Sequence, residues 1–535
     1  MASTYECGVK PAALMNKILG LLAFVVGCAA LPAAAQPTAP GPQDCVALRN
    51  LQLPGVVISE VTAEWIPAGP VPASFGMPPA TMLPAFCVLR GTLDRRTGVD
   101  RQQYGIGFAL ALPAVWNGRF LFQGGSGFNG VVRPPIGADT AGDMPALARG
   151  FAVASTDSGH RSDVPFDTAF LRDQQATLDF AYRAIERVTA VAKAILARHY
   201  GQPVSRSYYS GCSTGGREAM QAAQRYPMEF DGIIAGAPAM RTNYAVLGTD
   251  WVSVQLNQFA PRNAQGQPVT RDALSSMQKQ TVIDGVRNAC DANDGVRDGL
   301  VFNTSSCKFD PKTLVCDGAN SGAGCLTAAQ AAALESAFAG PRTSAGRPLY
   351  SPFPFDTGIA DAQQDIPGLL NGGLNLSPAS TTNIEAAARW ADSDGPSTLT
   401  NTTGWTNMTT FVNRGGKMIF FHGVSDPTFS ALDTVDYYNR LAGANGGADA
   451  VQRWSRLFLV PGMGHCGGGS LATDSFDLLT TLVNWVEQDV PPDAVIATRN
   501  GEPRLTRPLC AYPRYAHYLA PGDPNDAASF ACRAP

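Results

Sequence analysis

Hydrophobic and polar positions in the first part of the chain follow a strand-like pattern, which then gives way to one long helical pattern. Short apolar runs separated by Pro- and Gly-rich turns occupy residues 45–119 and are typical of antiparallel strands. Apolar runs at residues 108–112, 119–123 and 151–155 have the length and composition of buried strands. Residues 173–200 carry apolar side chains at helical spacing, so we expect a long amphipathic helix there.

Strands and helices continue to alternate after this helix. Residues 204–209 are compatible with a strand, residues 217–224 consist of good helix formers, and residues 230–238 fit the next strand. Further strands are expected at residues 416–423 and 456–461. An order of strand, helix, strand and helix predicts a parallel sheet with helices on its faces, which is an α/β fold.

Residues 241–405 interrupt this alternation. Gly, Asn, Ser, Thr and Pro become more frequent there, and four cysteines cluster in the segment. We interpret the segment as a large lid domain inserted over the C-terminal edge of the sheet, where open α/β sheets bind ligands. The α/β core is then made of two parts, residues 36–240 and residues 406–535.

The first 35 residues predict an export signal. Lys17 precedes an apolar run at residues 18–31, and the alanines at 33–35 suit signal-peptide cleavage. Two outcomes are compatible with this stretch: cleavage after Ala35, or lipidation of Cys28, which follows a glycine. No later apolar run is long enough to span a bilayer, so we expect a secreted or periplasmic protein.

Composition narrows the class of protein. The 535 residues are 45% hydrophobic and 16% charged, which is typical of a globular protein with a sizeable core. The formal net charge of −4 gives no electrostatic reason to expect nucleic acid or an anionic membrane as a partner. Of the 12 cysteines, Cys7 and Cys28 precede the expected cleavage point, and the even number that remains predicts disulfide bonds.

The candidate chemistry centres on Ser213. Residues 211–215, Gly-Cys-Ser-Thr-Gly, fit the Gly-Xaa-Ser-Xaa-Gly pattern between an expected strand and an expected helix. This is the context of a nucleophile elbow, in which glycines leave room for a sharp turn and the helix directs N–H groups at a developing oxyanion. The alternative is a chance match, because glycine and serine are common residues.

Two later residues complete an acyl-transfer triad. Asp426 and His465 each lie in a turn just after an expected strand, and the order Ser213, Asp426, His465 is the chain order of α/β-hydrolases. His465 would accept the serine proton, and Asp426 would hold the imidazole in the required tautomer. Asp433 and Asp474 are rivals for the acid, but neither immediately follows a strand.

Two neighbouring features are consistent with this site. The glycine-rich residues 124–130 follow an early strand, where hydrolases of this type place half of an oxyanion hole. Cys212 directly precedes Ser213, and Cys466 directly follows His465. A serine and a histidine within hydrogen-bond reach would therefore bring the two cysteines within disulfide distance.

The remaining histidines have other expected places. His422 lies in or at the end of a strand and is expected to pack in the core. His160 ends an earlier strand and is expected to line the pocket. His199, at the end of a helix, is expected to be exposed, and His517 lies in the C-terminal tail.

An acidic loop in the expected lid indicates a cation site. Asp291, Asp294 and Asp298 lie close together, with glycines to turn the chain, and suit a hard, oxygen-seeking cation such as Ca²⁺. Backbone carbonyls of Val296 and Leu300 would complete the ligand shell. The loop lacks the final glutamate of an EF-hand, and the alternative interpretation is an acidic surface turn.

The sequences around these residues resemble the tannase/feruloyl esterase family. The resemblance runs from about residue 45 to the C-terminus, and four stretches carry it: Gly-Cys-Ser-Thr-Gly-Gly-Arg, Cys-Asp-Ala-Asn-Asp-Gly-Val-Arg-Asp-Gly, His-Gly-Val-Ser-Asp and Pro-Gly-Met-Gly-His-Cys. Its most specific feature is the pair of cysteines next to the serine and the histidine. The resemblance implies an α/β-hydrolase core with a large lid inserted between the elbow strand and the acid strand.

The resemblance also implies roles for individual residues. It implies a triad of Ser213, Asp426 and His465, and an oxyanion hole formed by the N–H groups of Gly127 and Thr214. It implies a structural Ca²⁺ in the lid, bound by Asp291, Asp294, Val296, Asp298 and Leu300. The implied disulfide pairs are Cys45–Cys87, Cys212–Cys466, Cys290–Cys307, Cys316–Cys325 and Cys510–Cys532.

One departure from the family bears on the substrate. Members that cleave terephthalate monoesters carry a longer lid segment with an arginine that holds the free carboxylate of the substrate. The corresponding segment of this chain, residues 350–394, is shorter, and Arg389 is its only basic residue. We expect a serine carboxylesterase acting on a small aromatic ester: feruloyl or other hydroxycinnamoyl esters first, then gallate esters, as a tannase does, and mono(hydroxyethyl) terephthalate-like esters. A non-catalytic binding protein and a peptidase on the same scaffold are the rival classes.

Overall fold

The computed structural model describes residues 40–71, 81–317, 324–362, 366–374, 379, 381–499 and 504–535. The expected export signal at residues 1–35, with Cys28, lies outside the described residues. In the part of the chain that the structure describes, no helix has the length and apolar composition needed to cross a membrane.

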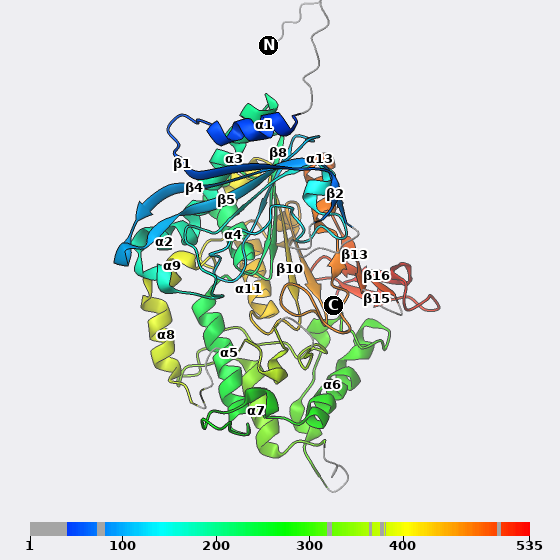
Figure 1. Ribbon diagram of the computed structural model, residues 1–535. Coiled ribbons are helices and arrows are strands. Elements are labelled where there is room, and N and C mark those ends of the chain that lie inside the picture. Colours follow the sequence, from blue (N-terminus) through cyan, green and yellow to red (C-terminus); the bar gives the residue numbers. More distant parts are fainter. Residues whose placement is uncertain are drawn as a thin grey trace, which may run out of the picture. The chain divides into compact units, whose positions relative to one another are not determined.

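One large sheet organises the described chain (Figure 1). In spatial order, its strands are β1 (Ile58–Ile66), β4 (Phe86–Thr97), β5 (Gln103–Pro113), β7 (Ala152–Thr156), β6 (Arg119–Gln123), β8 (Arg206–Cys212), β9 (Gly232–Gly236), β10 (Lys417–Gly423) and β11 (Ser455–Val460). Pairs from β1 to β7 are antiparallel, and pairs from β7 to β11 are parallel. The α/β prediction is therefore confirmed, with the predicted antiparallel strands joined to a parallel half.

Alternate side chains of the strands pack on opposite faces of this sheet. Phe420 of β10 belongs to a core shared with α3 (Ala184–Tyr200), α4 (Thr214–Arg225) and α11 (Ala431–Ala444). Its chain neighbours Ile419 and Phe421 belong to a second core, shared with α13 (Leu478–Gln488). A strand buried on both faces reads as a continuous apolar run, which is the pattern seen at residues 418–421.

The helical pattern at residues 173–200 is interrupted in the structure. It divides into α2 (Gln174–Leu178), a π-helical turn at Asp179–Arg183, and α3. The buried guanidinium of Arg217 donates hydrogen bonds to the carbonyl oxygens of Phe180 and Ala181, at 3.1 and 3.3 Å. These bonds provide partners for carbonyls inside the wider turn, which the hydrophobic pattern alone does not reveal.

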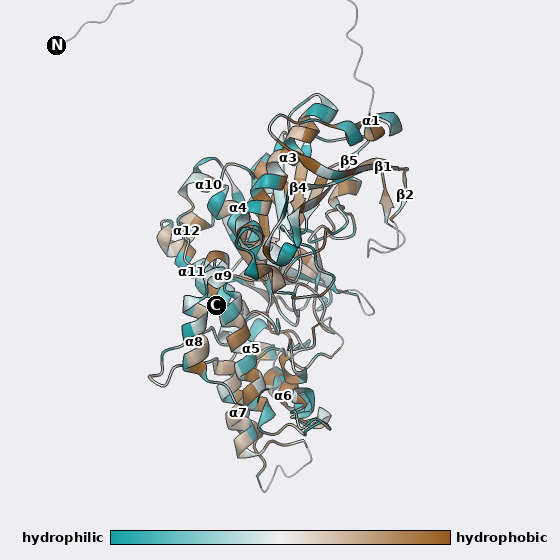
Figure 2. Ribbon diagram, turned by 60° about the vertical axis from the view of Figure 1, so that its left-hand side comes forward, coloured by the Kyte–Doolittle hydropathy of each residue, from teal (hydrophilic) through white to brown (hydrophobic). Residues whose placement is uncertain are grey.

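The segment between β9 and β10 contains most of the helices that lie away from the sheet (Figure 1). The helices of this segment are α5 (Thr242–Asn257), α6 (Ser276–Cys290), α7 (Ala328–Ala339), α8 (Ile384–Ser393), α9 (Gly395–Thr400) and α10 (Thr409–Asn413). Of these, α10 instead packs on the sheet, where its Phe411 belongs to the core that contains Phe420. Helix α5 packs against α7 and α8, and Leu256, Leu334 and Phe338 belong to a separate hydrophobic core. Figure 2 shows hydrophobic and hydrophilic residues sharing these helices. The boundaries of the lid at residues 241 and 405 stay a prediction.

The remaining elements are short. The helices are α1 (Pro42–Ala47) and α12 (Ala448–Val451); the small sheets are formed by β2 (Gly69–Pro70) with β3 (Met82–Leu83), by β12 (Ser475–Phe476), β13 (Ala494–Arg499) and β14 (Leu505–Cys510), and by β15 (Tyr515–Tyr518) with β16 (Phe530–Arg533). Disulfide bonds join Cys45–Cys87, Cys212–Cys466, Cys290–Cys307, Cys316–Cys325 and Cys510–Cys532. These are the pairs that the family resemblance implies, and such bonds are typical of proteins outside the cytoplasm.

Candidate active site

Ser213 lies at the sharp turn between β8 and α4. Its φ of 62° falls in a region that residues with side chains rarely adopt. Its N–H donates to the carbonyl of Gly236 at 3.0 Å, and its carbonyl accepts from the N–H of Ala239, also at 3.0 Å. The neighbouring chain at the end of β9 therefore holds the strained turn on both sides.

Glycines allow backbones to meet around this turn. A Cβ on Gly215 would lie 2.7 Å from the carbonyl oxygen of Gly125, and a Cβ on Gly216 would lie 2.2 Å from that of Gly236. A Cβ on Gly124 would similarly lie 2.7 Å from the Cα of Gly215. Only glycine therefore fits at these positions, and the glycine-rich loop at residues 124–130 packs directly against the start of α4.

His465 and Asp426 form a hydrogen-bonded pair in the loops after β11 and β10. His465 Nδ1 lies 2.8 Å from Asp426 Oδ2, and the side chain of Asp426 is completely buried. The imidazole also makes an edge contact with the ring of Phe429, with the centroids 5.3 Å apart. Because β8, β10 and β11 lie in the parallel half of the sheet, their C-terminal ends meet at one edge.

A second histidine contacts the same carboxylate. His422 Nε2 lies 3.2 Å from Asp426 Oδ2, and its Nδ1 lies 2.8 Å from Thr434 Oγ1. His422 is buried in the core, as the sequence predicts, but its contact with Asp426 was not foreseen. Its only signal in the sequence is the spacing of four residues between the histidine and the aspartate.

The surroundings of Asp426 favour its charged form. Burial by itself raises the pKa of this carboxyl group. The charge of His465 and the hydrogen bonds from His422 and His465 outweigh burial and hold the pKa below its usual range. The backbone N–H groups of Thr428 and Phe429 also donate to Asp426 Oδ1, at 2.8 and 3.1 Å. The carboxylate therefore stays ionised beside the imidazole.

One cavity of about 110 Å³ brings the candidate residues together. Its lining includes Ser213, His465, Gly127 and Thr214. Thr214 is the first residue of α4, and Gly127 has a φ of 56° within the glycine-rich loop. The other lining residues are Ser126, Phe128, Phe166, Ala239, Thr242, Ala245, Val246, Thr249, Ile366, Leu374, Thr428 and Phe429. None of the described lining residues is Lys or Arg, and the lining combines aromatic and aliphatic side chains with hydroxyl groups.

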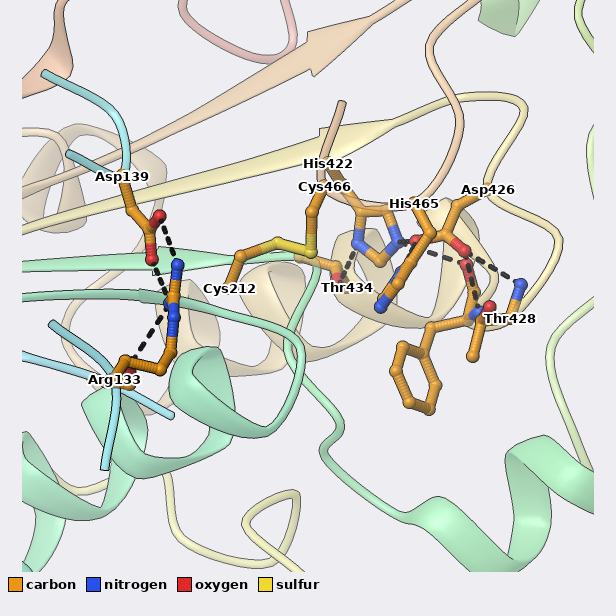
Figure 3. Close-up of a disulfide and its surroundings, with 11 residues drawn as sticks. Arg133, Asp139, Cys212, His422, Asp426, Thr428, Thr434, His465 and Cys466 are labelled. Atoms are coloured by element: carbon orange, nitrogen blue, oxygen red, sulfur yellow. Dashed lines mark hydrogen bonds and ion pairs between the residues drawn. A yellow bond between two sulfur atoms is a disulfide. The ribbon is translucent and has the colours of Figure 1, made fainter. Parts of the chain in front are cut away.

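A disulfide joins the backbones on either side of this cavity. Cys212, which precedes Ser213, is bonded to Cys466, which follows His465, with their Cα atoms 5.9 Å apart. Figure 3 shows this bond together with His465, Asp426 and His422. The bond links chain positions separated by 254 residues, so it closes the loop that carries the whole inserted segment.

The other candidate acids take part in different interactions. Asp433 accepts hydrogen bonds from Arg241 Nε at 3.1 Å and from Ser351 Oγ at 2.7 Å. Asp474 Oδ2 accepts from the N–H of Gly468 at 2.8 Å, so it supports the histidine loop without contacting His465. Asp426, the aspartate that directly follows a strand, is therefore the one that pairs with His465, and the two rival aspartates have other partners.

Two histidine predictions were wrong. His160 lines a different cavity with Glu60 and Arg161, where its ring stacks on Phe170 at 3.7 Å. Burial lowers the pKa of His160 to about 4, so the ring stays neutral. His199 is partly buried, because the helix that carries it packs against the antiparallel strands.

The acidic loop after α6 has a compact, hydrogen-bonded conformation. Asp291 Oδ1 accepts from the N–H groups of Asp298 and Gly299, at 3.3 and 3.2 Å, and Asp294 Oδ2 accepts from that of Phe302 at 3.0 Å. Arg507 forms an ion pair with Asp298. Among the described residues, no three His, Cys, Asp or Glu side chains group together as a metal site would require. Calcium binding by this loop stays a prediction.

Comparison with known proteins places these features in a family. The fold is that of an α/β hydrolase, and residues 91–390 and 375–533 match the family described as tannase and feruloyl esterase. The chain belongs to this family, whose members are carboxylic ester hydrolases. The class of enzyme that the resemblance implies is therefore confirmed.

Relatives and solved structures extend over most of the chain. Mono(2-hydroxyethyl) terephthalate hydrolase of Piscinibacter sakaiensis is 38% identical, over 88% of this chain and 88% of its own. Feruloyl esterase B of Aspergillus niger is 30% identical, over 79% of this chain and 82% of its own. The crystal structure of feruloyl esterase B from Aspergillus oryzae has a TM-score of 0.74 at 26% identity and covers 92% of this chain and 100% of its own.

Proposed function

We propose that this protein is an exported serine esterase that hydrolyses esters of hydroxycinnamic acids, with feruloyl esters as the main substrates. The observation that carries the proposal is a cavity lined by both Ser213 and His465, with Asp426 hydrogen-bonded to the histidine at 2.8 Å. A binding protein would have no need for this arrangement. The disulfide bonds and the N-terminal sequence support export from the cytoplasm.

The reaction follows from the proposed roles. Ser213 Oγ attacks the ester carbonyl carbon while His465 Nε2 accepts the hydroxyl proton. The N–H groups of Gly127 and Thr214 stabilise the negative oxygen of the tetrahedral intermediate. His465 then gives the proton to the departing alkoxide, which leaves as an alcohol. Water, deprotonated by the same histidine, releases the aromatic acid and restores Ser213. Throughout, Asp426 keeps Nδ1 protonated and stabilises the imidazolium.

The lining of the cavity supports a neutral aromatic acyl group. Phe128, Phe166 and Phe429 provide rings for stacking and edge contacts. No Lys or Arg is among its described lining residues, so nothing charged is available there to pair with a free carboxylate on the ring. The resemblance to feruloyl esterase B in sequence and structure points the same way.

A substrate panel tests this assignment. Methyl ferulate, methyl gallate, a terephthalate monoester and a peptide amide are assayed in parallel, and kcat/KM is compared. We expect methyl ferulate to be cleaved fastest. The 38% identity to the terephthalate monoester hydrolase makes that ester the second candidate. Faster cleavage of the terephthalate monoester or of methyl gallate would overturn the choice of acid, and cleavage of the amide alone would overturn the esterase assignment.

A further inference from the structure

A second, larger cavity adjoins the catalytic one. Its volume is about 470 Å³, against about 110 Å³ for the catalytic cavity. The two cavities share Phe128, Thr214 and Thr242, so they meet beside the N-terminus of α4. Among the described residues of its lining there is none of the proposed triad, so the space lies beyond the site of bond cleavage.

The walls of this cavity combine aromatic and polar side chains. Phe128, Phe170 and Phe180 pack together on the core side, and Trp390 of α8 contributes from the inserted segment with 58% of its surface exposed. The polar lining comes from Thr168, Arg172, Arg217, Asn243, Asp394, Ser397 and Thr400. Both arginines have partners within the protein: Arg172 forms an ion pair with Asp100, and Arg217 donates to the carbonyl oxygens of Phe180 and Ala181. Aromatic faces bind planar rings, and hydroxyl and amide groups at the edge bond their polar substituents.

We propose that this cavity is a second substrate subsite, which binds a ring-bearing group remote from the ester bond. This inference rests on the proposed esterase function. The ring belongs either to an extended acyl group or to a large alcohol, and both present the same chemistry to Trp390. The preferred substrates are then esters with two ring systems, since a simple methyl ester leaves the larger cavity without a ligand.

Two pairs of esters distinguish a ring on the acyl group from a ring on the alcohol. In the alcohol pair, methyl ferulate is compared with the ferulate ester of a phenolic benzyl alcohol. In the acyl pair, methyl cinnamate is compared with methyl 4-phenylcinnamate. The ratio of kcat/KM, large ester over small ester, is measured for each pair. We expect the wild type to prefer the large ester in at least one pair, and the pair that responds identifies the side of the ester that the subsite holds.

Two tryptophan variants provide the matched test. Trp390→Ala should lower the large-to-small ratio about tenfold in the responding pair, because a stacking face is lost. Trp405→Ala is the control: Trp405 is 56% exposed in the same inserted segment but does not line either cavity. A ratio that Trp390→Ala leaves unchanged in both pairs overturns the subsite. Absence of methyl ferulate hydrolysis by the wild type instead contradicts the proposed function.

An independent observation concerns a buried carboxylate near the oxyanion loop. Glu218 is 1% exposed and lies one turn after Thr214 on α4. It accepts hydrogen bonds from the N–H of Gly125 at 3.0 Å and from Tyr209 Oη at 2.9 Å. Asn129 Nδ2 and Ser158 Oγ donate to its other oxygen, at 2.6 and 2.8 Å. Four donors therefore satisfy a carboxylate that burial would otherwise make costly.

These bonds close the glycine-rich loop around Glu218. Gly125 and Asn129 lie on either side of Gly127, and the Asn129 side chain folds back so closely that a Cβ on Gly125 would lie 2.2 Å from its Oδ1. Helix α4 thus carries Thr214 at its first residue and holds the loop of Gly127 through Glu218. The same helix face fixes the spacing between the two N–H groups assigned to the oxyanion hole.

We propose that Glu218 is a positioning residue for the oxyanion hole. It acts through the loop without touching the substrate, and this inference also rests on the proposed function. Hydrogen-bond donors that are displaced by about 1 Å from their best position stabilise the transition state much less, while binding of the substrate in the ground state changes little. Removing the anchor should therefore lower kcat with little change in KM.

Adjacent tyrosines on β8 provide a matched control. Tyr209 donates to Glu218, whereas Tyr208, which faces the other core, donates to Glu487 at 2.6 Å. We expect Glu218→Gln to lower kcat about 10- to 100-fold on methyl ferulate with KM within about twofold. Glu487→Gln should lower stability only. If Glu218→Gln does not fold, Tyr209→Phe takes its place and Tyr208→Phe is the control, since each removes only one hydrogen bond to the respective glutamate.

Binding of a transition-state analogue gives a readout that a merely structural role would not change. A trifluoromethyl ketone adds reversibly to the serine and places its oxyanion in the hole. Its inhibition constant should rise in Glu218→Gln in proportion to the fall in kcat, and stay constant in Glu487→Gln. Equal kcat per folded molecule in the two variants, or an unchanged inhibition constant in Glu218→Gln, overturns the role. Lack of any adduct with the wild type would instead contradict the proposed nucleophile.

Discussion

The side chain of Asp426 connects several parts of the proposed site. It accepts from His465, His422 and two backbone N–H groups, so its position is fixed from several directions. A carboxylate held in this way determines which nitrogen of His465 carries the proton. The neutral base must have Nε2 free to accept the proton of Ser213, and that requires Nδ1 to be the protonated nitrogen.

Replacing this charge should affect catalysis far more than folding. We expect Asp426→Asn to lower kcat on methyl ferulate by about 10⁴-fold, because the amide favours the wrong imidazole tautomer. Circular dichroism and the melting temperature report whether the variant folds. A variant that folds and retains kcat within about tenfold of the wild type would show that Asp426 is not the acid of the triad.

A second buried aspartate predicts a pH dependence of stability. Asp157 is 1% exposed, and burial raises its pKa to about 8, despite hydrogen bonds from the N–H groups of Gly159 and Gly107. An aspartate in an unfolded chain has a pKa of about 3.9. The folded state therefore binds the proton more tightly, and this contribution to stability is present below about pH 4 and is lost as the pH rises to about 8.

The comparison with Asp157→Asn isolates this effect. The variant cannot ionise at this position, so the difference in unfolding free energy, wild type minus variant, should fall between pH 5 and pH 8. Urea unfolding at several pH values measures it. A difference that stays constant or rises with pH over this range would show that the carboxyl group is already ionised in the folded protein.

Secondary-structure elements place these side chains, and their order was readable from the sequence. The strand patterns at residues 119–123, 151–155, 416–423 and 456–461 correspond to β6, β7, β10 and β11. Glycine spacing identified the turn at Ser213, since few other residues allow such close backbone contacts. The π-helical turn before α3 was not predictable, because it depends on the guanidinium of Arg217 from another helix.

The disulfide beside the site predicts an effect on turnover as well as on stability. The Cys212–Cys466 bond closes a loop of 254 residues, and the chain-entropy model gives such a bond about 5 kcal/mol. It also ties together the backbones next to Ser213 and His465. We expect the double Cys→Ala variant of this pair to lose turnover per folded molecule, measured on methyl ferulate well below its melting temperature.

The Cys510–Cys532 pair is the control, because it joins β14 to β16 away from the catalytic cavity. Its double Cys→Ala variant should lower the melting temperature and keep turnover per folded molecule near that of the wild type. Equal turnover in the two variants would mean that the central bond is only a structural link. Two free thiols at Cys212 and Cys466 in the native protein would show that this disulfide is not formed.

For the molecule as a whole, local patterns in the sequence identified the candidate residues of the triad, whereas contacts that depend on packing were not predictable from it. The triad candidates follow strands or lie in a glycine-flanked turn, so spacing and chain order were enough to find them. Glu218 and its donors Gly125 and Ser158 come from separate segments, which the sheet order alone brings together. The cavity at Trp390 likewise forms between the core and the inserted segment, so it could not be predicted from any single stretch of the sequence.

Calcium binding by the acidic loop is a prediction about the stability of the whole molecule. A cation bound to the folded chain alone would stabilise it, so exhaustive chelation should lower the melting temperature and Ca²⁺ should restore it. Turnover at 25 °C should change less than stability, because no residue of the acidic loop is among the described lining of the catalytic cavity. Asp294→Asn should lose the response to Ca²⁺. An unchanged melting curve after chelation, with no calcium in the purified protein by atomic emission, would refute the site.

The central claim is that Ser213 is the nucleophile of an esterase, and covalent labelling tests it most directly. Diethyl p-nitrophenyl phosphate phosphorylates an activated serine and releases p-nitrophenolate. We predict one diethylphosphoryl group per chain, on the peptide containing Ser213, with loss of methyl ferulate hydrolysis in proportion. Ser213→Ala should fold, resist labelling and lower kcat by at least about 10⁴-fold. A label on another residue, or hydrolysis that persists in the fully labelled protein, would contradict the account.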